Sequence, residues 1–119
     1  MKLSKKKILI IVAHTDDESF GCGGFIKKMS LNKNKISAIS FTNGVGSRWN
    51  NKEKEIKKRK ISSIKASKIL GFNWLAQYNY PDNKLDSVNL LDIIQVIEKH
   101  KKQFRPHVVI THNFSDLNI

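Results

Sequence analysis

The sequence is poor in the residues that mark several protein classes. It has one cysteine, Cys22, among 119 residues, which excludes an internal disulfide framework and a zinc finger built from several cysteines. Its longest apolar run, Ile8–Ala13, is far shorter than the ~20 residues that cross a bilayer. The run also lacks the small-residue cleavage site of a secretory signal. We therefore expect a cytoplasmic protein without a membrane span.

Acidic and aromatic residues are scarce as well. Ten Asp and Glu stand against 22 Lys and Arg, a net charge of +12, and 8% of the residues are aromatic. Such a charge would suit nucleic-acid binding. However, the lysines are scattered along the chain, at Lys5–Lys7, Lys27–Lys35, Lys52–Lys68 and Lys99–Lys102. They do not form one stripe, and few aromatic residues lie near them to stack on bases, so nucleic acid is only the third hypothesis for the partner.

Apolar runs rich in β-branched residues predict the strands. Lys7–Ala13 and His107–Thr111 are typical of strands buried on both faces of a parallel sheet. Ile36–Thr42 predicts a third strand, and Trp74–Tyr80 gives the weakest signal for a fourth.

Helical periodicity predicts three helices between these strands, at Ser19–Ser30, Glu53–Leu70 and Ser87–Gln103. Gly71 is a stop signal for the second helix. The resulting order is β-α-β-α-β-α-β, which indicates one α/β domain over residues 1–119. We expect three layers with a doubly wound, mostly parallel, Rossmann-like sheet that is incomplete at the C-terminus.

The predicted helices also suggest how they pack. Two apolar faces are expected, the first made of Cys22, Phe25, Ile26 and Met29, the second of Leu90, Ile93, Ile94, Ile97 and Phe104. Three glycines in the first helix, Gly21, Gly23 and Gly24, would fit a close approach of another backbone. We expect Trp74 to pack in the core, His107 to be structural and His100 to be solvated at a lysine-rich helix end.

Ligands of open α/β sheets bind beyond the carboxyl ends of the strands. That rule brings four polar segments to one edge: His14–Glu18, Asn43–Arg48, Pro81–Asn83 and His112–Asn118. These segments hold most of the reactive side chains, so chain organisation and chemistry point to the same edge.

The first of these segments has the composition of a metal site. His14 and Asp17 stand three residues apart, so an imidazole nitrogen and a carboxylate oxygen could converge on one cation, as a catalytic zinc requires. Asp16 would then be placed to take a proton from a zinc-bound water. The alternative is that these carboxylates only cap the next helix.

A second histidine, His112, closes the last predicted strand. If the strands are parallel, His112 opens onto the same edge as His14, although it could also simply bind a loop carbonyl. Arg48 in the first long loop could contact a substrate hydroxyl or phosphate, or could be a solvated loop residue.

These segments resemble the LmbE-like, or PIG-L-type, zinc-dependent N-acetylglucosaminyl deacetylases. The family carries Ala-His-Pro-Asp-Asp-Glu after its first strand, and residues 13–18 read Ala-His-Thr-Asp-Asp-Glu. Residues 111–119 are similar to the start of the family's Thr-His-x-x-x-Asp-Leu-Asn-x-Asp-His motif, and residues 80–86 to its Pro-Asp-Asn-x-Leu-Asp loop. The helix that ends in Ile69-Leu70-Gly71 resembles the family's Arg-x-x-Glu helix, with Arg59 in the arginine position and Ser62 where glutamate is usual.

The resemblance implies a role for each matching residue. His14 and Asp17 would be zinc ligands, and Asp16 would be the general base. His112 would act in catalysis close to the metal, with Asn118 beside it. Arg59 and Asp82 would bind the sugar. The implied reaction is hydrolysis of an N-acetyl group on a small-molecule amino sugar.

The sequence also departs from the family's pattern. It ends at Ile119, where the family continues with Asp-His and its third zinc ligand. We therefore expect a truncated domain that alone binds zinc weakly, hydrolyses little and self-associates through uncovered apolar surface. Thr15 in place of proline would loosen the ligand turn. The alternatives are a non-catalytic remnant that binds a sugar or phosphate, and the nucleic-acid binder.

Overall fold

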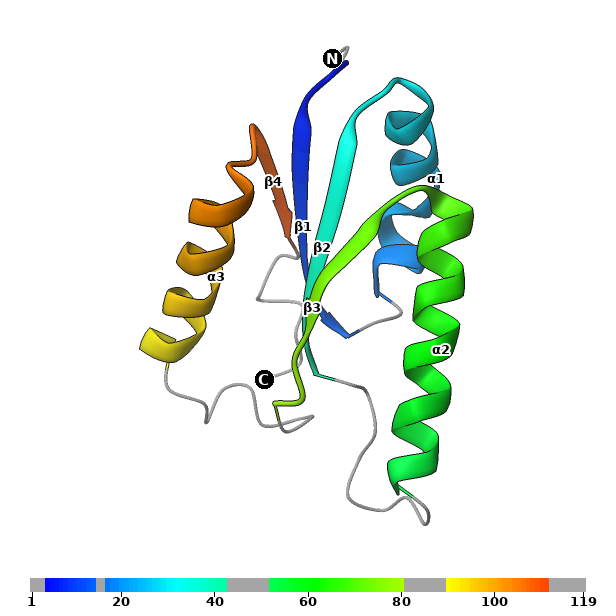
Figure 1. The fold of residues 1–119 in the computed structure, drawn as a ribbon, viewed down its shortest axis with the longest axis vertical. Helices are drawn as coiled ribbons and strands as arrows, with labels where there is room; N and C mark the ends of the chain where they lie inside the picture. The colour runs from blue at the N-terminus through cyan, green and yellow to red at the C-terminus, as the bar shows by residue number, and fades with distance from the viewer. Residues whose placement is uncertain (1–3, 15–16, 43–51, 81–89, 112–119) are drawn as a thin grey trace.

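The computed structural model describes residues 4–14, 17–42, 52–80 and 90–111, in which four strands alternate with three helices (Figure 1). The strands are β1 (Lys7–His14), β2 (Lys35–Thr42), β3 (Asn73–Gln77) and β4 (Val108–Thr111). The helices are α1 (Asp17–Leu31), α2 (Lys52–Leu70) and α3 (Leu90–Phe104). All seven predicted elements are confirmed, with bounds that differ by a few residues.

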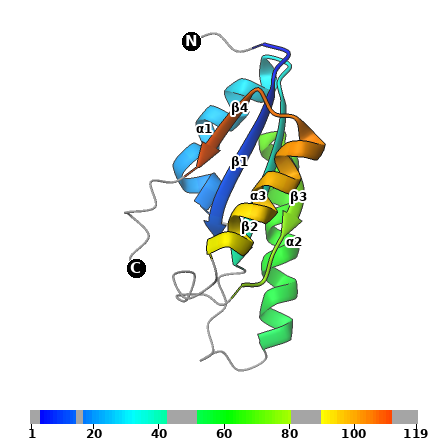
Figure 2. The ribbon, with the colours of Figure 1, turned by 90° about the vertical axis from the view of Figure 1, so that its left-hand side faces the viewer.

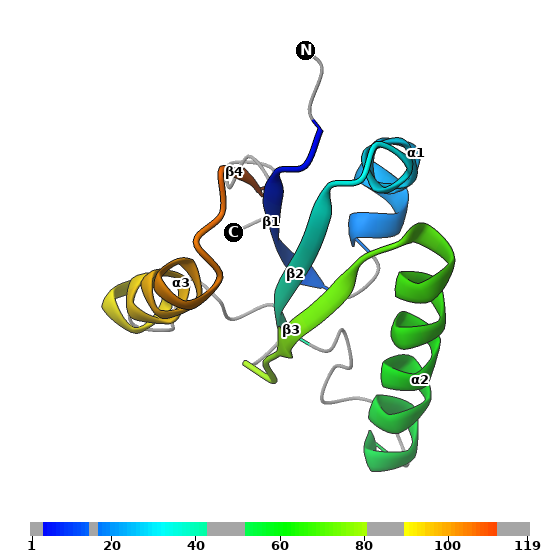
Figure 3. The same ribbon diagram turned by 45° about the horizontal axis from the view of Figure 1, so that its top comes forward.

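The strands form one parallel sheet in the order β3-β2-β1-β4. The chain winds outward from β1 through β2 to β3 and then returns to the other side of β1 for β4. Helices α1 and α2 cover one face and α3 covers the other (Figure 3). This confirms the predicted three-layer, doubly wound α/β fold. Within the described residues, no helix is both long and apolar enough to cross a bilayer.

The alternation of β1 explains why the sheet is apolar on both faces. Ile8, Ile10 and Val12 pack with α1 and with the start of β3, in a cluster that includes Ile26 and Phe72. Leu9 and Ile11 point to the other face and pack against α3. Because side chains of a strand alternate between faces, a strand covered on both sides needs an unbroken apolar run. That run was the strongest strand signal in the sequence.

A register shift interrupts the pairing of β3 with β2. Ala38 pairs with Trp74 and Ile39 pairs with Ala76, so Leu75 is an extra residue with no partner in β2. Such a bulge reverses which face the following residues point to. Trp74 packs against the core on the α1–α2 face, which confirms its predicted packing role, and Ala76 packs on the α3 face.

The connections at the amino end of the sheet are short and well packed. Gly71 ends α2 with φ of 90°, and a Cβ there would collide with the side chain of Ser30 on α1. Asn34, 7% exposed, accepts a hydrogen bond from the Lys6 backbone N–H (2.9 Å) and donates one to the Met29 carbonyl (2.9 Å). His107 accepts a hydrogen bond from the Lys7 N–H at Nδ1, which confirms its structural role.

Three expectations about packing were wrong in detail. Phe25 is 39% exposed and Ile94 is 44% exposed, because each lies beside the apolar face of its helix and not at its centre. Gly23 and Gly24 would leave a Cβ with nothing within 4 Å, so no other described backbone approaches them. Cys22 lies in the part of α1 whose side chains are not described, so its predicted packing stays a prediction.

Candidate active site

Two of the predicted site residues, His14 and Asp17, stand at the same end of the sheet. β1 ends at His14, which pairs with Thr42 at the end of β2, and α1 begins at Asp17. His14 and Asp17 therefore stand at the end of an internal strand and at the start of the helix that follows it. A carboxylate at that helix position is favoured by the helix dipole.

The segment with Asp82 begins at the same end of the sheet. After β3 the chain continues along β2, since the Tyr78 N–H donates to the Ser40 carbonyl and the Tyr80 N–H donates to the Phe41 carbonyl, each at 2.8 Å. Tyr80 thus lies one strand position from Thr42. Asp82 follows it by two residues but lies outside the described residues.

β4 is shorter than β1 at this end. Thr111, its last residue, pairs with Ile11. His14 is three residues further along β1, about 10 Å at the usual rise of a strand. The parallel direction of β4, on which the prediction for His112 depended, is confirmed. His112 and Asn118 themselves lie outside the described residues.

Arg59 is the predicted substrate-binding residue that the structure describes fully. It lies on α2, on the same helical row as Ser63 and Ser67, which are buried against the sheet. Its Nε is 3.8 Å from Glu55 Oε1, and the two side chains are 30% and 26% exposed. Ser62, in the position where the family has glutamate, is exposed. Arg59 lies in the half of α2 that is nearer the carboxyl end of the sheet.

The remaining site predictions are not tested by the structure. Asp16, Arg48, Asp82, His112 and Asn118 lie outside the described residues, and the side chains of His14 and Asp17 are not described either. Among the described residues, no three His, Cys, Asp or Glu side chains gather as a metal site would need.

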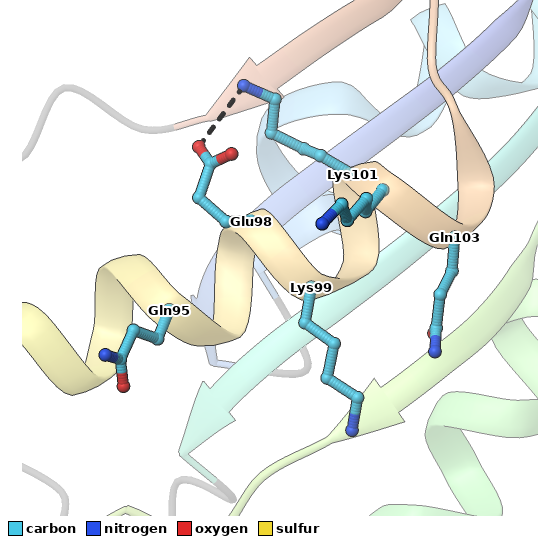
Figure 4. A pocket seen from close by; sticks show the side chains of 6 residues that line it. Gln95, Glu98, Lys99, Lys101 and Gln103 are labelled. Atoms are coloured by element: carbon cyan, nitrogen blue, oxygen red, sulfur yellow. Dashed lines mark ion pairs between the residues drawn. The ribbon is translucent and has the colours of Figure 1, made fainter.

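A hollow on the surface lies along α3. It is lined by Gln95, Glu98, Lys99, Lys101, Lys102 and Gln103 (Figure 4). All six side chains come from one helix, and Glu98 is paired with Lys101 at 3.5 Å. It contains none of the predicted site residues, so it does not form part of the candidate active site.

One buried polar pair, formed by His100 and Tyr78, was not predicted from the sequence. His100 is only 7% exposed, and its Nε2 lies 2.7 Å from the Tyr78 hydroxyl. The prediction that His100 is solvated was wrong, because the residue faces the sheet between Ile97 and Phe104 of the apolar row. Burial, with a smaller contribution from Lys99, lowers the pKa of His100. Burial and the neighbouring Tyr80 raise the pKa of Tyr78. The spacing of Ile93, Ile97, His100 and Phe104 could have revealed that the histidine is buried.

A comparison with known protein families identifies the family of this chain. The sequence profile of the family described as PIG-L, GlcNAc-PI de-N-acetylase, matches residues 9–118. The chain belongs to the PIG-L family. The match begins within β1 and includes every predicted site residue, and it confirms the resemblance drawn from the motifs at residues 13–18 and 111–119.

Solved structures with this fold include enzymes of more than one kind. N,N'-diacetylchitobiose deacetylase from Pyrococcus horikoshii is 26% identical, with a TM-score of 0.72 over 87% of this chain and 39% of the other. The A40926 pseudoaglycone deacetylase is 20% identical, with a TM-score of 0.72 over 89% and 50% of the two chains. The hydratase GalB from Pseudomonas putida is 17% identical, with a TM-score of 0.79 over 92% and 48%.

The chain thus spans half or less of the length of these three structures. No curated protein sequence matches it. The last two of the three solved structures show the likeness of fold alone.

Proposed function

We propose that this protein takes part in the hydrolysis of an N-acetyl group on an amino sugar, with a bound zinc ion. The observation that carries the proposal is the match of residues 9–118 to a family described as a de-N-acetylase. The position of His14 and Asp17 supports it, since both stand at the carboxyl end of the sheet, where α/β enzymes bind their ligands.

The donor types of the two predicted ligands fit zinc. An imidazole and a carboxylate are both common zinc ligands, and a catalytic zinc takes three protein ligands. His14 and Asp17 would supply two of them. With two ligands, we expect the 119-residue chain to bind zinc weakly.

In the proposed reaction, the zinc ligands, the general base and His112 have different roles. A zinc ion held by His14 and Asp17 would polarise the acetamide carbonyl and lower the pKa of a nearby water. Asp16 would take the proton of the attacking water as the carbon–oxygen bond forms, and would deliver it to the amine as the carbon–nitrogen bond breaks. His112 would donate a hydrogen bond to the carbonyl oxygen as it becomes negative.

The other site residues would bind the sugar. Arg59, held by Glu55, and Asp82 would bind sugar hydroxyls. Arg48 would contact the substrate as well, and Asn118 would contact it close to the metal. The products are acetate and the free amino sugar.

The fold by itself does not choose the reaction, because one fold hosts many activities. GalB, which has the highest of the three TM-scores, is a hydratase. A hydratase adds water across a carbon–carbon double bond and releases no acetate. Acetate release therefore separates the proposal from the reaction that GalB catalyses.

The first experiment is a zinc titration by calorimetry, followed by an assay of acetate release from N,N'-diacetylchitobiose. We expect weak zinc binding that Asp17→Ala abolishes. The matched control is Asp92→Ala, because Asp92 is also in the first turn of a helix at this end of the sheet. Equal loss of zinc affinity in the two variants would contradict the assignment of Asp17.

The assay of the general base uses the same substrate. We expect Asp16→Asn to lower acetate release by about 10²- to 10⁴-fold, the usual contribution of a general base. Zinc affinity should persist in this variant. If Asp16→Asn releases acetate as fast as the unaltered chain, Asp16 is not the base.

A further inference from the structure

The amino end of the sheet collects cations from separate parts of the chain. The turns before β1, β2 and β4 contain Lys5 and Lys6, Lys33, and Arg105. Figures 1 and 2 place these turns together at the end of the molecule that is opposite to the candidate active site. These cations are far apart in the sequence, but parallel strands bring all their incoming turns to one end of the sheet.

Backbone hydrogen bonds join these turns to one another. The Lys35 N–H donates to the Lys6 carbonyl (2.8 Å), and the His107 N–H donates to the Lys7 carbonyl (2.8 Å). The turn with Lys33 is therefore joined to the strand entry at Lys6. The turn with Arg105 is joined to the same entry from the other side.

Helix dipoles explain only some of these cations. Lys28, Lys68, Lys101 and Lys102 lie in last turns of helices, where a positive charge is favoured in any protein. Lys33 and Arg105 directly follow the last turns of α1 and α3, since their N–H groups donate to the Ser30 and Lys101 carbonyls, whereas Lys5 belongs to no helix. Lys5, Lys33 and Arg105 have φ of 56°, 63° and 54°, a region that favours glycine and asparagine over lysine and arginine. Cations thus occupy the positions where another residue type would fit the backbone better.

Acidic residues do not balance this charge. In the described part of the chain, Glu53, Glu55 and Asp92 lie in first turns of helices, at the other end of the molecule. Glu98 is paired with Lys101. The exposed cations Lys5, Lys33 and Arg105 therefore create a positive potential at this end.

Two exposed aliphatic side chains lie at the same end. Leu31, at the end of α1, is 72% exposed, and Ile69, near the end of α2, is 69% exposed, the highest values among the large apolar residues of the described chain. The helix ends adjoin one another, because Lys27 Nζ donates to the Ile69 carbonyl at 3.0 Å. Cations around exposed aliphatic groups are typical of surfaces that bind at a membrane interface.

We infer that this surface, formed by Lys5, Lys6, Lys33, Arg105, Leu31 and Ile69, docks on an anionic lipid bilayer. The cations contact acidic headgroups, and the two aliphatic side chains enter the interface. Nucleic acid is the less suitable partner, because two isolated aliphatic groups cannot stack on bases. In this orientation the eight residues of β1 hold the candidate active site about 25 Å from the bilayer surface. The inference is independent of the proposed function.

Sedimentation with vesicles tests the inference on the full chain. We expect binding to vesicles of phosphatidylcholine mixed with phosphatidylserine, little binding to phosphatidylcholine alone, and weaker binding as salt is raised. The triple variant Lys5→Asn, Lys33→Asn, Arg105→Asn should lose roughly a hundredfold in affinity. It should still fold, since asparagine tolerates the left-handed backbone.

The matched control is Lys54→Gln, Lys57→Gln, Lys60→Gln. These lysines are exposed on α2, and the control removes as much charge as the test variant. It should keep most of the affinity. Failure of the unaltered chain to bind the acidic vesicles, or an equal loss in the two variants, would overturn the inference.

A second pair of variants separates a bilayer from a nucleic acid. Leu31→Ser with Ile69→Ser should weaken binding to acidic vesicles by at least about tenfold. Leu31→Ser with Ile61→Ser is the control, because Ile61 is 49% exposed on the same helix as Ile69 and should lose less. Unchanged vesicle binding in the first pair, together with tight binding of a short RNA, would overturn the inference in favour of a nucleic-acid surface.

Discussion

The two ends of the sheet differ in how their connections are built. At the amino end, residues 32–34, 71–72 and 105–107 join a helix to the next strand, and Asn34 and Phe72 within them are buried. At the carboxyl end, residues 43–51 and 78–89 are the longer connections, and they include two of the predicted site residues, Arg48 and Asp82. The buried connections at the amino end therefore fix the helices against the sheet, while the longer connections at the carboxyl end carry predicted site residues. Variants at the two ends should therefore affect different measurements.

The largest effect on stability is expected from Gly71→Ala. The new Cβ would meet the Ser30 side chain and would force an L residue into φ of 90°. Together these changes should lower the free energy of unfolding by about 3 kcal/mol, measured by urea denaturation. Gly24→Ala is the control, since nothing lies within 4 Å of its Cβ, and it should stabilise the helix by about 0.5–1 kcal/mol. The comparison of the two ends fails if Asp16→Asn costs as much stability as Gly71→Ala.

Asn34→Ala should have the next largest effect. The substitution removes the acceptor of the Lys6 N–H and the donor to the Met29 carbonyl in a side chain that is 7% exposed. We expect a loss of about 2 kcal/mol in the free energy of unfolding, because buried polar groups lose their partners. Asn32→Ala, at an exposed position of the same turn, should change it by less than about 0.5 kcal/mol. Equal losses would mean that this turn does not depend on the buried amide.

The burial of His100 predicts how the free energy of unfolding changes with pH. Burial lowers its pKa below the value of 6.5 that applies in the unfolded chain, so the unfolded chain binds more protons as the pH falls below 6.5. Stability should therefore be highest above pH 6.5 and should decrease on acidification below it. His100→Gln should flatten this part of the curve of unfolding free energy against pH. His107→Gln, at an exposed histidine, is the control. An unchanged slope in His100→Gln would contradict the role given to His100.

The smallest effect is expected from Lys33→Gly. Glycine adopts φ of 63° without the steric cost of a side chain, so we expect a gain of about 0.5 kcal/mol in the free energy of unfolding. Lys28→Gly, inside the last turn of α1, should instead lose about 0.5–1 kcal/mol. A loss of stability in Lys33→Gly would show that the lysine side chain contributes to the fold of this turn.

Most of the fold was predictable because its signals are local. The apolar runs of β1 and β4, the helical periodicity of α3 and the stop at Gly71 each depend on neighbouring residues in the sequence. Long-range packing was harder to predict. His100 was assigned to solvent because lysines surround it in the sequence, and its partner Tyr78 lies on another element. Nothing in the sequence indicated the bulge at Leu75.

The candidate site was predictable only as a motif. His14 and Asp17 could be placed because each adjoins a regular element, and the structure puts them at the predicted end of the sheet. Asp16, Asp82 and His112 lie in connections whose conformation does not follow from local periodicity. Their roles therefore depend on the family resemblance and on the experiments proposed above.

The bulge in β3 restricts the lengths that this strand can have in the fold. Because Leu75 is unmatched, Trp74 reaches α2, where its Nε1 donates to the Ser63 carbonyl (3.1 Å), while Tyr78 reaches His100 on α3. Deletion of one residue between Trp74 and Tyr78 would turn one of these side chains to the opposite face of the sheet. A deletion of two residues would keep their faces and only shorten the strand. Among homologues, the length of this segment should therefore vary in steps of two.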